Sequence, residues 1–184
     1  MDQEQFRLAQ RGDQDALNEL VVTYQQAVFS LCYRMLRVRT EAEDAAQEAM
    51  VKAVMKLHSY DADRPFKPWI LRIASNECID RIRRRKDAIS LDGMGEDGAW
   101  EWQVGDSPNP EASFLKEEEH ALINDKLNDL TPLDKMVISL FYWEGLAYTE
   151  ISEITDLSVS AIKSRLFRAR RELASLLVKE GTYA

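Results

Sequence analysis

A run of positive charge near the end of the chain is the feature with the clearest chemistry. Residues 159–171 hold five Lys or Arg side chains and no acidic one, although the whole chain of 184 residues carries a net charge of −8. Cations gathered along a helix are typical of a surface that approaches phosphate. A solvated basic helix gives a similar pattern, and here its core-facing residues would be Ile162, Leu166, Leu173 and Leu177. The run alone does not decide between the two.

The residues just before this run favour contact with DNA. The pattern over 148–155 predicts a short helix, and 156–158 predicts a tight turn. Ser158 is placed to cap the next helix, because its hydroxyl can accept a hydrogen bond from the backbone N–H groups that begin it. A helix, a short turn and a basic helix form the helix-turn-helix pattern.

A second set of side chains suited to nucleic acid lies between residues 69 and 86. Its members recur three and four residues apart, opposite an apolar stripe, and they are Trp69, Arg72, Asn76, Asp80 and Arg83, continued by the basic cluster 81–86. Cations can hold phosphates, an exposed ring can stack on a base, and an amide can contact a base edge. A solvated face with an incidental Trp is the alternative, and the acidic Asp80 favours it.

Three helices are expected to position this stripe. Apolar residues at helical spacing predict a long first helix that begins at a cap, Asp13, and reaches Met35. Thr40 and Glu43 form a Thr-x-x-Glu capping pattern, which predicts the start of a second helix with a small, alanine-rich inner face and an acidic outer one. The third helix follows a polar connector over 58–67, and Pro68 stands where its first residue belongs.

An acidic segment separates these helices from the rest. Residues 89–119 hold nine acidic side chains and one basic one, together with four of the seven glycines and no helical or strand periodicity. We therefore interpret them as a linker. Trp100 and Trp102 within it either pack locally or anchor the segment on a partner surface.

The remaining elements are helical as well. Residues 121–130 have a helical pattern, Thr131 and Pro132 have the types of a cap and a first-turn residue, and Gly145 marks a helix end before the helix-turn-helix. No segment alternates strongly enough to predict a sheet. The sequence therefore predicts an all-α protein of two small helical domains joined by the acidic linker.

Cysteine content and hydropathy restrict the environment. Cys32 and Cys78 each stand among apolar residues without the neighbouring ligands that a zinc site requires, so buried thiols are expected. No stretch approaches the roughly 20 apolar residues of a membrane span, and the amino terminus is polar and acidic rather than a secretion signal. We expect a cytoplasmic protein without direct membrane insertion.

An enzyme is disfavoured by the sequence. Glu117 and His120 have the spacing of one half of a di-metal carboxylate site, but no second half is present. No phosphate-binding glycine loop or nucleophile motif is found either. We expect no catalytic residue, no cofactor, no metal and no small-molecule substrate.

Several of these segments resemble the extracytoplasmic-function (ECF) sigma factors of the sigma-70 family. Residues 41–48, 64–76 and 80–85 resemble the family's second conserved region, and residues 147–154 and 162–170 resemble its fourth. The resemblance implies a domain of region 2 over 1–88, a linker over 89–119 and a helix-turn-helix domain of region 4 over 120–184. It also implies a factor that directs core RNA polymerase to promoters and promotes transcription initiation, held before use by an anti-sigma partner.

The resemblance implies three groups of contact residues. Those that match the helix docking on the beta-prime clamp helices of core RNA polymerase are Asp44, Gln47, Glu48 and Lys52. Those that match the part holding the opened minus-ten strand are Ser59, Tyr60, Asp61, Arg64, Lys67, Trp69, Arg72, Asn76, Arg83 and Arg84. Those that match the helix reading the minus-thirty-five element are Ser160, Lys163, Ser164, Arg165, Phe167, Arg168 and Arg171.

Three positions depart from the family pattern. Ala45 and Ala46 stand where bulky apolar residues are common, Asp156 stands where Gly is frequent, and Ala161 stands where Thr is frequent. Asp156 is compatible with the turn because Asp can adopt a left-handed conformation.

The alternative function is a helix-turn-helix regulator that acts without polymerase. Promoter binding measured with and without core enzyme separates this regulator from a sigma factor.

The linker has a further implied role. In the family it runs through the active-site cleft and the RNA exit path, where an acidic segment can occupy a cationic channel in place of RNA. The alternative is a solubilising connector.

Overall fold

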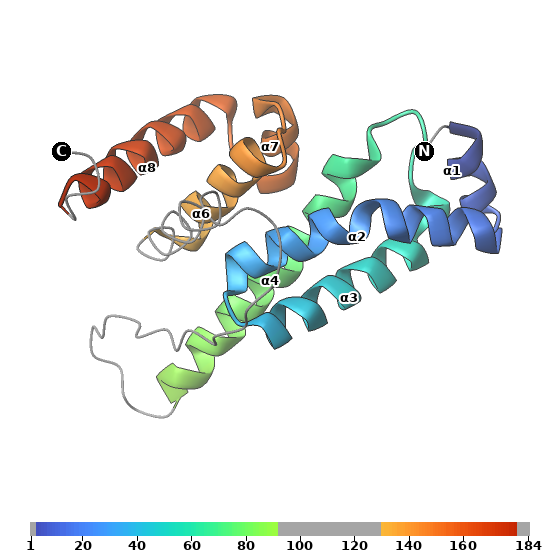
Figure 1. Ribbon diagram of the computed structural model, residues 1–184, viewed down its shortest axis with the longest axis horizontal. Helices are drawn as coiled ribbons and strands as arrows, with labels where there is room; N and C mark the ends of the chain where they lie inside the picture. The colour runs from blue at the N-terminus through green and yellow to red at the C-terminus, as the bar shows by residue number, and fades with distance from the viewer. Residues whose placement is uncertain (1–2, 92–129, 180–184) are drawn as a thin grey trace, which may run out of the picture. The chain divides into compact units, whose positions relative to one another are not determined.

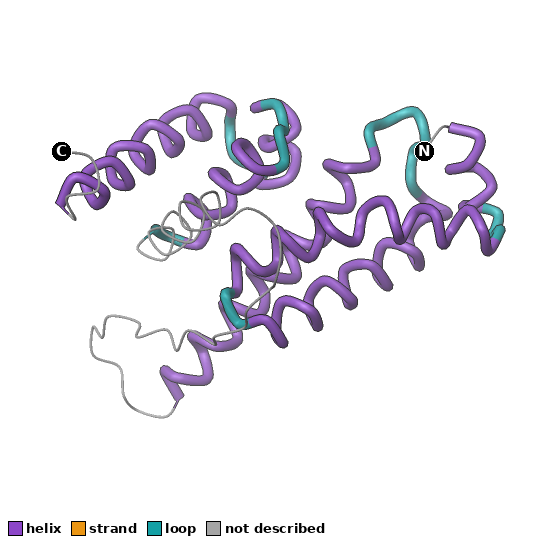
Figure 2. Tube along the Cα trace, viewed as in Figure 1, coloured by secondary structure: helices purple, strands orange, loops and turns teal. Residues whose placement is uncertain are grey.

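The computed structural model describes residues 3–91 and 130–179 of the chain. These residues form helices and connecting turns, with no strand among them, which confirms the all-α prediction (Figure 2). The chain divides into two compact units, Met1–Gly105 and Asp106–Ala184. The proposed linker from residue 92 on, with Trp100 and Trp102, and residues 121–129 of the predicted helix lie outside the described residues.

The first unit begins with a short helix that the apolar spacing did not reveal, α1 (Gln3–Gln10). Helix α2 (Gln14–Leu36) then starts at the predicted cap, where Oδ1 of Asp13 accepts a hydrogen bond from the backbone N–H of Ala16 at 3.0 Å. It ends at Arg37, whose φ of 67° is in the left-handed region and turns the chain sharply. Only Arg37 and Val38 connect it to the next helix.

Helix α3 (Arg39–Lys56) begins earlier than the capping pattern predicted. The cap position is Val38, which has no side-chain hydrogen bond to offer, and Thr40 lies inside the first turn. The prediction of a Thr40 cap was wrong because the two-residue turn after α2 already sets where α3 begins, and Glu43 pairs with Arg39 instead. The small inner face was predicted correctly, since its residues with no exposed surface are Ala42, Ala45, Ala49 and Ala53.

A short 3₁₀ turn, η1 (Leu57–Ser59), and a connector lead to α4 (Phe66–Leu91). Pro68 is the third residue of α4 rather than the first, so that prediction was also wrong. The helix begins at Phe66 because this ring is buried among other aromatic side chains, and a proline is still tolerated in a first turn whose N–H groups lack partners. Residues 89–91, expected in the linker, continue the helix.

Helices α2, α3 and α4 pack against one another around a shared core (Figure 1). Leu31 and Met35 of α2 and Ile70 and Leu71 of α4 are buried in it. Cys32 and Cys78 are buried free thiols, as predicted. The hydrogen bond with Cys32, together with burial, raises the pKa of the Cys78 thiol.

The second unit contains α6 (Pro132–Ile138), a π-helical turn η3 (Ser139–Trp143), α7 (Tyr148–Thr155) and α8 (Val159–Lys179). Thr131 caps α6 as predicted, because its Oγ1 accepts from the backbone N–H of Asp134 at 3.2 Å. The π-helical turn was not predicted. The chain then turns at Gly145, whose φ is 68°.

Within the described ranges, no helix combines the length and the apolar character needed to cross a lipid bilayer.

Candidate nucleic-acid interfaces

The turn before α8 has the geometry that the sequence predicted. Asp156 ends α7 in the left-handed region with a φ of 57°. Oγ of Ser158 accepts from the backbone N–H of Ala161 at 3.2 Å, so it caps α8. The hydroxyl of Ser152 donates to the carbonyl oxygen of Leu157, which holds the turn against α7. The end of α7 and the start of α8 are therefore set by local signals.

One face of α8 is buried and the other is open to solvent. Ile162, Leu166 and Ala169 are buried against the unit's core. The predicted contact residues that are exposed on the opposite side are Ser160, Lys163, Ser164, Phe167, Arg168 and Arg171. Phe167 is 61 % exposed, an unusual position for an aromatic ring unless a partner covers it. The side chains of Leu173 and Leu177, expected in the core stripe, lie outside the described residues.

Two of the predicted contact residues on α8 also contact their own unit. Nζ of Lys163 lies 5.4 Å from the centroid of the Tyr148 ring, which stacks on Phe141. Nη1 of Arg165 lies 2.8 Å from Oδ1 of Asp134 in the first turn of α6. Arg165 is half-buried by this ion pair, so its side chain fixes α8 to α6 instead of reaching outward as expected.

The outward stripe of α4 also exists as predicted. Arg72, Asn76, Asp80 and Arg83 are exposed, opposite Ile70, Ala74 and Cys78, which are fully buried. Arg84 is exposed beside them. The stripe therefore offers an amide and three guanidinium groups to solvent along one side of a helix.

Trp69 is held at the start of this stripe by an aromatic cluster, which comprises Phe6, Tyr24, Tyr60, Phe66 and Trp69. The Trp69 ring centroid lies 4.9 Å from that of Tyr60 and 5.2 Å from that of Phe66. The Trp69 side chain remains half-exposed. The cluster thus fixes the orientation of a ring that solvent can still reach.

Tyr60 is buried, although it was expected to contact the opened strand. Only 7 % of it is exposed, and its hydroxyl donates to the carbonyl oxygen of Arg64. Burial is the main cause that raises the pKa of Tyr60 to about 12. In the same connector Ser59, Asp61 and Arg64 are exposed, and Lys67 is half-buried. Tyr60 therefore shapes the connector from within.

A network of four charged residues joins α3 to α4. Its central residue, Glu77, was not among the predicted site residues. Glu77 is only 2 % exposed, and its carboxylate accepts hydrogen bonds from Nζ of Lys52 at 2.6 Å and from Nε of Arg81 at 2.9 Å. Glu48 contacts the same two cations, at 3.0 Å and 3.1 Å. Glu41 pairs with Arg85, which lies about one turn after Arg81 on α4, whereas Glu41 lies about two turns before Glu48 on α3. We call Glu48, Lys52, Glu77 and Arg81 the ion network.

The protonation of Glu77 follows from these partners. Burial alone would raise the pKa of its carboxyl group, but the hydrogen bonds from Lys52 and Arg81 outweigh burial and hold the pKa below its ordinary value. Glu77 is therefore ionised at neutral pH. The signal for it in the sequence was an acid within the apolar stripe of α4, four residues before an arginine.

The network divides the predicted docking residues into two pairs. Asp44 and Gln47 are exposed on α3. Glu48 and Lys52 also face outward in part, but both are engaged with α4. Ion pairs with α3 divide the basic cluster of α4 in the same way. Arg81 and Arg85 face α3, whereas Arg83 and Arg84 are exposed.

Comparison with known proteins identifies the family of the chain. Residues 20–88 match the family described as Sigma-70 region 2, and residues 120–173 match Sigma-70, region 4. The ECF RNA polymerase sigma factor SigW of Bacillus subtilis is 36 % identical over 181 residues, which cover 96 % of this chain and 97 % of SigW. The chain belongs to the ECF sigma factors of the sigma-70 family.

Solved structures share its fold. The structure of CnrH in complex with the cytosolic domain of CnrY matches with a TM-score of 0.70 and 25 % identity, over 97 % of each chain. The sigma factor RpoE of Bartonella quintana, solved with the anti-sigma factor NepR, matches with a TM-score of 0.74 and 24 % identity, over 87 % of this chain and 95 % of that one. Sigma factors act as initiation factors, and this one directs core RNA polymerase to promoter DNA.

No group of three potential metal ligands occurs among the residues described, which exclude Glu117 and His120.

Proposed function

We propose that residues 1–88 dock the sigma factor on core polymerase and hold the opened minus-ten strand, and that residues 120–184 read the minus-thirty-five element. Residues 89–119 connect the two. The family matches to residues 20–88 and 120–173 support this division. The observation that carries the proposal is the outward stripe of α4, where a half-exposed ring fixed by its neighbours precedes an exposed amide and exposed cations.

The minus-ten contacts use this stripe and the connector before it. Trp69 presents its free face to an unstacked base, Asn76 contacts a base edge, and Arg72, Arg83 and Arg84 hold phosphates. Ser59, Asp61, Arg64 and Lys67 border the same strand. Tyr60 acts indirectly, because its buried ring supports Trp69.

The polymerase contact uses the outer face of α3. Asp44 and Gln47 face the beta-prime clamp helices directly, since both are exposed. Glu48 and Lys52 contribute their exposed parts while the ion network keeps α3 fixed on α4. Docking and strand binding are thus placed on two helices that hydrogen bonds and ion pairs join.

The minus-thirty-five contact uses the exposed face of α8. Lys163, Ser164, Phe167 and Arg168 reach base edges in the major groove, and Ser160 and Arg171 contact the backbone beside them. Arg165 positions the helix through Asp134. The regulator that would act without polymerase is set aside because the chain also matches region 2.

The sigma factor performs no covalent chemistry and needs no cofactor in this proposal. It acts in the cytoplasm, where polymerase and promoters meet. An anti-sigma protein covers it before use, and the similarity to CnrH, solved in complex with the cytosolic domain of CnrY, supports such a partner.

Transcription in vitro tests the proposal. Core polymerase with this sigma factor should initiate at a subset of candidate promoters that core enzyme alone ignores. Asn76→Ala should lower permanganate reactivity of minus-ten thymines in the bound complex, whereas Asn18→Ala, an exposed amide on α2, should not. Normal reactivity with Asn76→Ala would remove that residue from strand binding.

A further inference from the structure

Helix α1 lies against the turn where the chain leaves α3 for the connector. The side-chain amide of Gln10 donates to two backbone carbonyl oxygens there, that of Leu57 at 3.0 Å and that of Tyr60 at 2.6 Å. Tyr60 N–H also donates to the Leu57 carbonyl oxygen, which closes the 3₁₀ turn η1. Gln10 thus joins both ends of this turn from a helix nearly 50 residues earlier in the chain.

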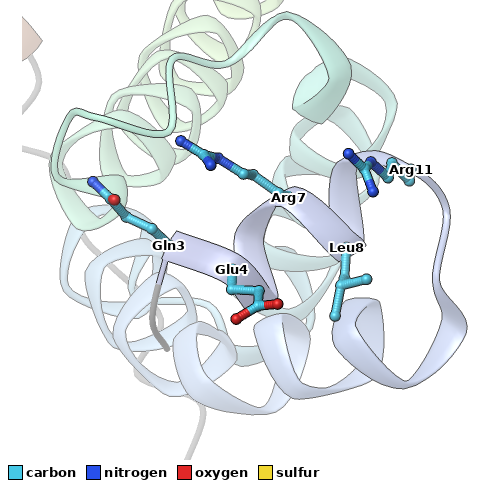
Figure 3. Close-up of a pocket in the computed structure, with 5 residues that line it drawn as sticks. All are labelled: Gln3, Glu4, Arg7, Leu8 and Arg11. Atoms are coloured by element: carbon cyan, nitrogen blue, oxygen red, sulfur yellow. The ribbon is translucent and has the colours of Figure 1, made fainter.

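Two further contacts join α1 to the connector and to the start of α4. Nε2 of Gln3 donates to Oδ1 of Asp63 at 3.2 Å, and in Figure 3 the Gln3 side chain points toward the ribbon that follows α3. The Phe6 ring lies 5.0 Å from the Phe66 ring, centroid to centroid, and 6.2 Å from that of Tyr60. Helix α1 therefore contacts the connector at its beginning, in its middle and where α4 starts.

The buried position of Tyr60 gives this arrangement a consequence for the surface. The Tyr60 ring packs against the Trp69 ring, so a shift of the Tyr60 backbone would move the Trp69 ring, which solvent can reach. The two hydrogen bonds from Gln10 hold that backbone at its carbonyl and three residues earlier. An ordered connector binds a strand more tightly than one that must become ordered during binding.

We propose that Gln10 is a positioning residue for the single-strand DNA site, acting through Leu57 and Tyr60 on the connector and on Trp69. The inference rests on the proposed role of that site in holding the minus-ten strand. Gln10 itself stands outside residues 20–88, which match region 2. Helix α1 is accordingly part of the strand-binding machinery although it offers no base contact of its own.

Substitutions at Gln10 separate the hydrogen bonds from the shape of the side chain. Gln10→Met keeps the length of the side chain and removes both donors. Gln10→Lys keeps a donor group that can reach the two carbonyl oxygens. Gln5→Met is the matched control, because the Gln5 amide on the same helix donates to Oε2 of Glu19 on α2.

Hydrogen exchange of the free protein gives the first measurement, which needs no DNA. Gln10→Met should accelerate amide exchange over residues 57–64 and leave the buried parts of α2 and α4 as protected as before. Gln10→Lys should restore the protection, and Gln5→Met should not change it. Unchanged exchange over 57–64 in Gln10→Met would overturn the proposal.

The second measurement uses holoenzyme and a fluorescent single-stranded oligonucleotide with the nontemplate minus-ten sequence of a promoter that the holoenzyme transcribes. Gln10→Met should lower the affinity of the holoenzyme for this oligonucleotide about tenfold, as expected for two lost hydrogen bonds. The affinity of the sigma factor for core polymerase should be unchanged. Gln10→Lys should recover most of the loss. Equal losses of core and oligonucleotide affinity would show a general folding defect and would overturn the positioning role.

The proposed function has its own readout in the same assay. Asn76→Ala and Trp69→Ala should each lower oligonucleotide affinity, and in Asn76→Ala exchange over 57–64 should stay normal. Wild-type affinity in both would overturn the strand-binding role of α4, and the exchange measurement would still decide whether Gln10 holds the connector. Wild-type affinity in Gln10→Met beside weakened Asn76→Ala would overturn the inference alone.

Discussion

Two arginines three residues apart on α8 have different roles. Arg168 is exposed on the face that carries Lys163, Ser164 and Phe167, whereas Arg165 is half-buried and pairs with Asp134. In the sequence both belong to one basic run. Their contacts in the fold predict opposite results when each is replaced.

Arg168→Ala should lower promoter discrimination by about 1–3 kcal/mol, because one bidentate contact to a base contributes that much. Holoenzyme binding to matched and scrambled minus-thirty-five sequences measures it. An equal loss on both sequences would show that Arg168 contacts only phosphate.

Arg165→Ala should instead affect folding. It leaves the Asp134 carboxylate, which also accepts from the Thr131 hydroxyl, without its cation, so the free energy of unfolding should fall by roughly 1–2 kcal/mol after allowing for partial exposure of the pair. Discrimination between the two promoter sequences should be unchanged once the variant is folded. A selective loss on the matched sequence would return Arg165 to the group of base contacts.

Tyr60 makes a prediction about alkaline stability. Its folded pKa of about 12 lies above the ordinary value of 10.0, because burial disfavours the phenolate. A folded pKa that is raised contributes stability below the unfolded value, and this contribution is lost as pH rises from about 10 to about 12. Thermal unfolding of Tyr60→Phe should depend less steeply on pH over this range than that of the wild type. The same pH dependence of unfolding in the variant and the wild type would show that folding does not shift the pKa of the Tyr60 phenol.

The ion network is the main electrostatic feature at the scale of helices. Replacing the buried carboxylate of Glu77 by a neutral amide removes one ionised acceptor from Lys52 and Arg81 and leaves them Glu48 as the other. Lys52 and Arg81 can still reach water, since 41 % and 22 % of their side chains are exposed. Glu77→Gln should therefore lower the free energy of unfolding by about 1.5–3 kcal/mol, measured by urea unfolding of the full chain.

The same variant has a pH signature. Because the folded pKa of Glu77 is depressed, the stability it contributes is present above the unfolded value and is lost as pH falls through the folded value. The difference between wild type and Glu77→Gln should begin to narrow as pH falls below about 4 and should close only below the folded pKa. Glu43→Gln on the exposed side of α3 is the control and should cost less than about 0.5 kcal/mol. A difference that does not narrow as pH falls below about 4 would mean that Glu77 acts through packing.

The helices were predictable where local chemistry marks their ends. Asp13, Thr131 and Ser158 cap α2, α6 and α8 as their types and positions indicate. The predictions failed where contacts distant in sequence, or the turn that ends the preceding helix, set the boundary. Phe66 starts α4 because its ring fits among others, and α3 starts right after the turn at Arg37.

The candidate interfaces were predictable as faces but not as individual contacts. Helical spacing correctly gave the exposed stripe of α4 and the exposed side of α8. Spacing could not show that Arg165 bends back to Asp134, or that Tyr60 turns inward, since both depend on another element. Helix α1 was missed because Phe6 and Ala9 alone give too short an apolar pattern.

Across the whole molecule, charge is divided unevenly. Residues 1–88 and 120–184 are each nearly neutral, and residues 89–119 hold the excess of acid. A neutral spacer would connect two domains without self-repulsion. The acidic residues are therefore explained either by binding to a partner surface or by keeping the chain soluble. A cationic nucleic-acid channel of the polymerase is the surface such a segment would fit.

Neutralising this segment tests the idea on the full holoenzyme. The change replaces five acids by their amides, at Asp92, Glu96, Asp97, Glu101 and Asp106. Core binding should weaken at low salt and converge with the wild type at high salt, because the lost attraction is one that ions screen. The yield of short abortive transcripts should change as well. Equal affinity at every salt concentration, with an unchanged abortive pattern, would leave the segment as a connector.

The ion pairs between α3 and α4 also have a consequence for the order of synthesis. Helix α3 has no side-chain cap at Val38, and two of the cations that pair with it, Arg81 with Glu48 and Arg85 with Glu41, lie more than 30 residues later, on α4. A nascent chain that ends within the connector therefore carries an α3 that keeps Lys52 but lacks these two arginines. The ribosome must release α4 through Arg85 before α3 has all its ion pairs, so the helix proposed to dock on polymerase is completed together with the helix proposed to hold DNA.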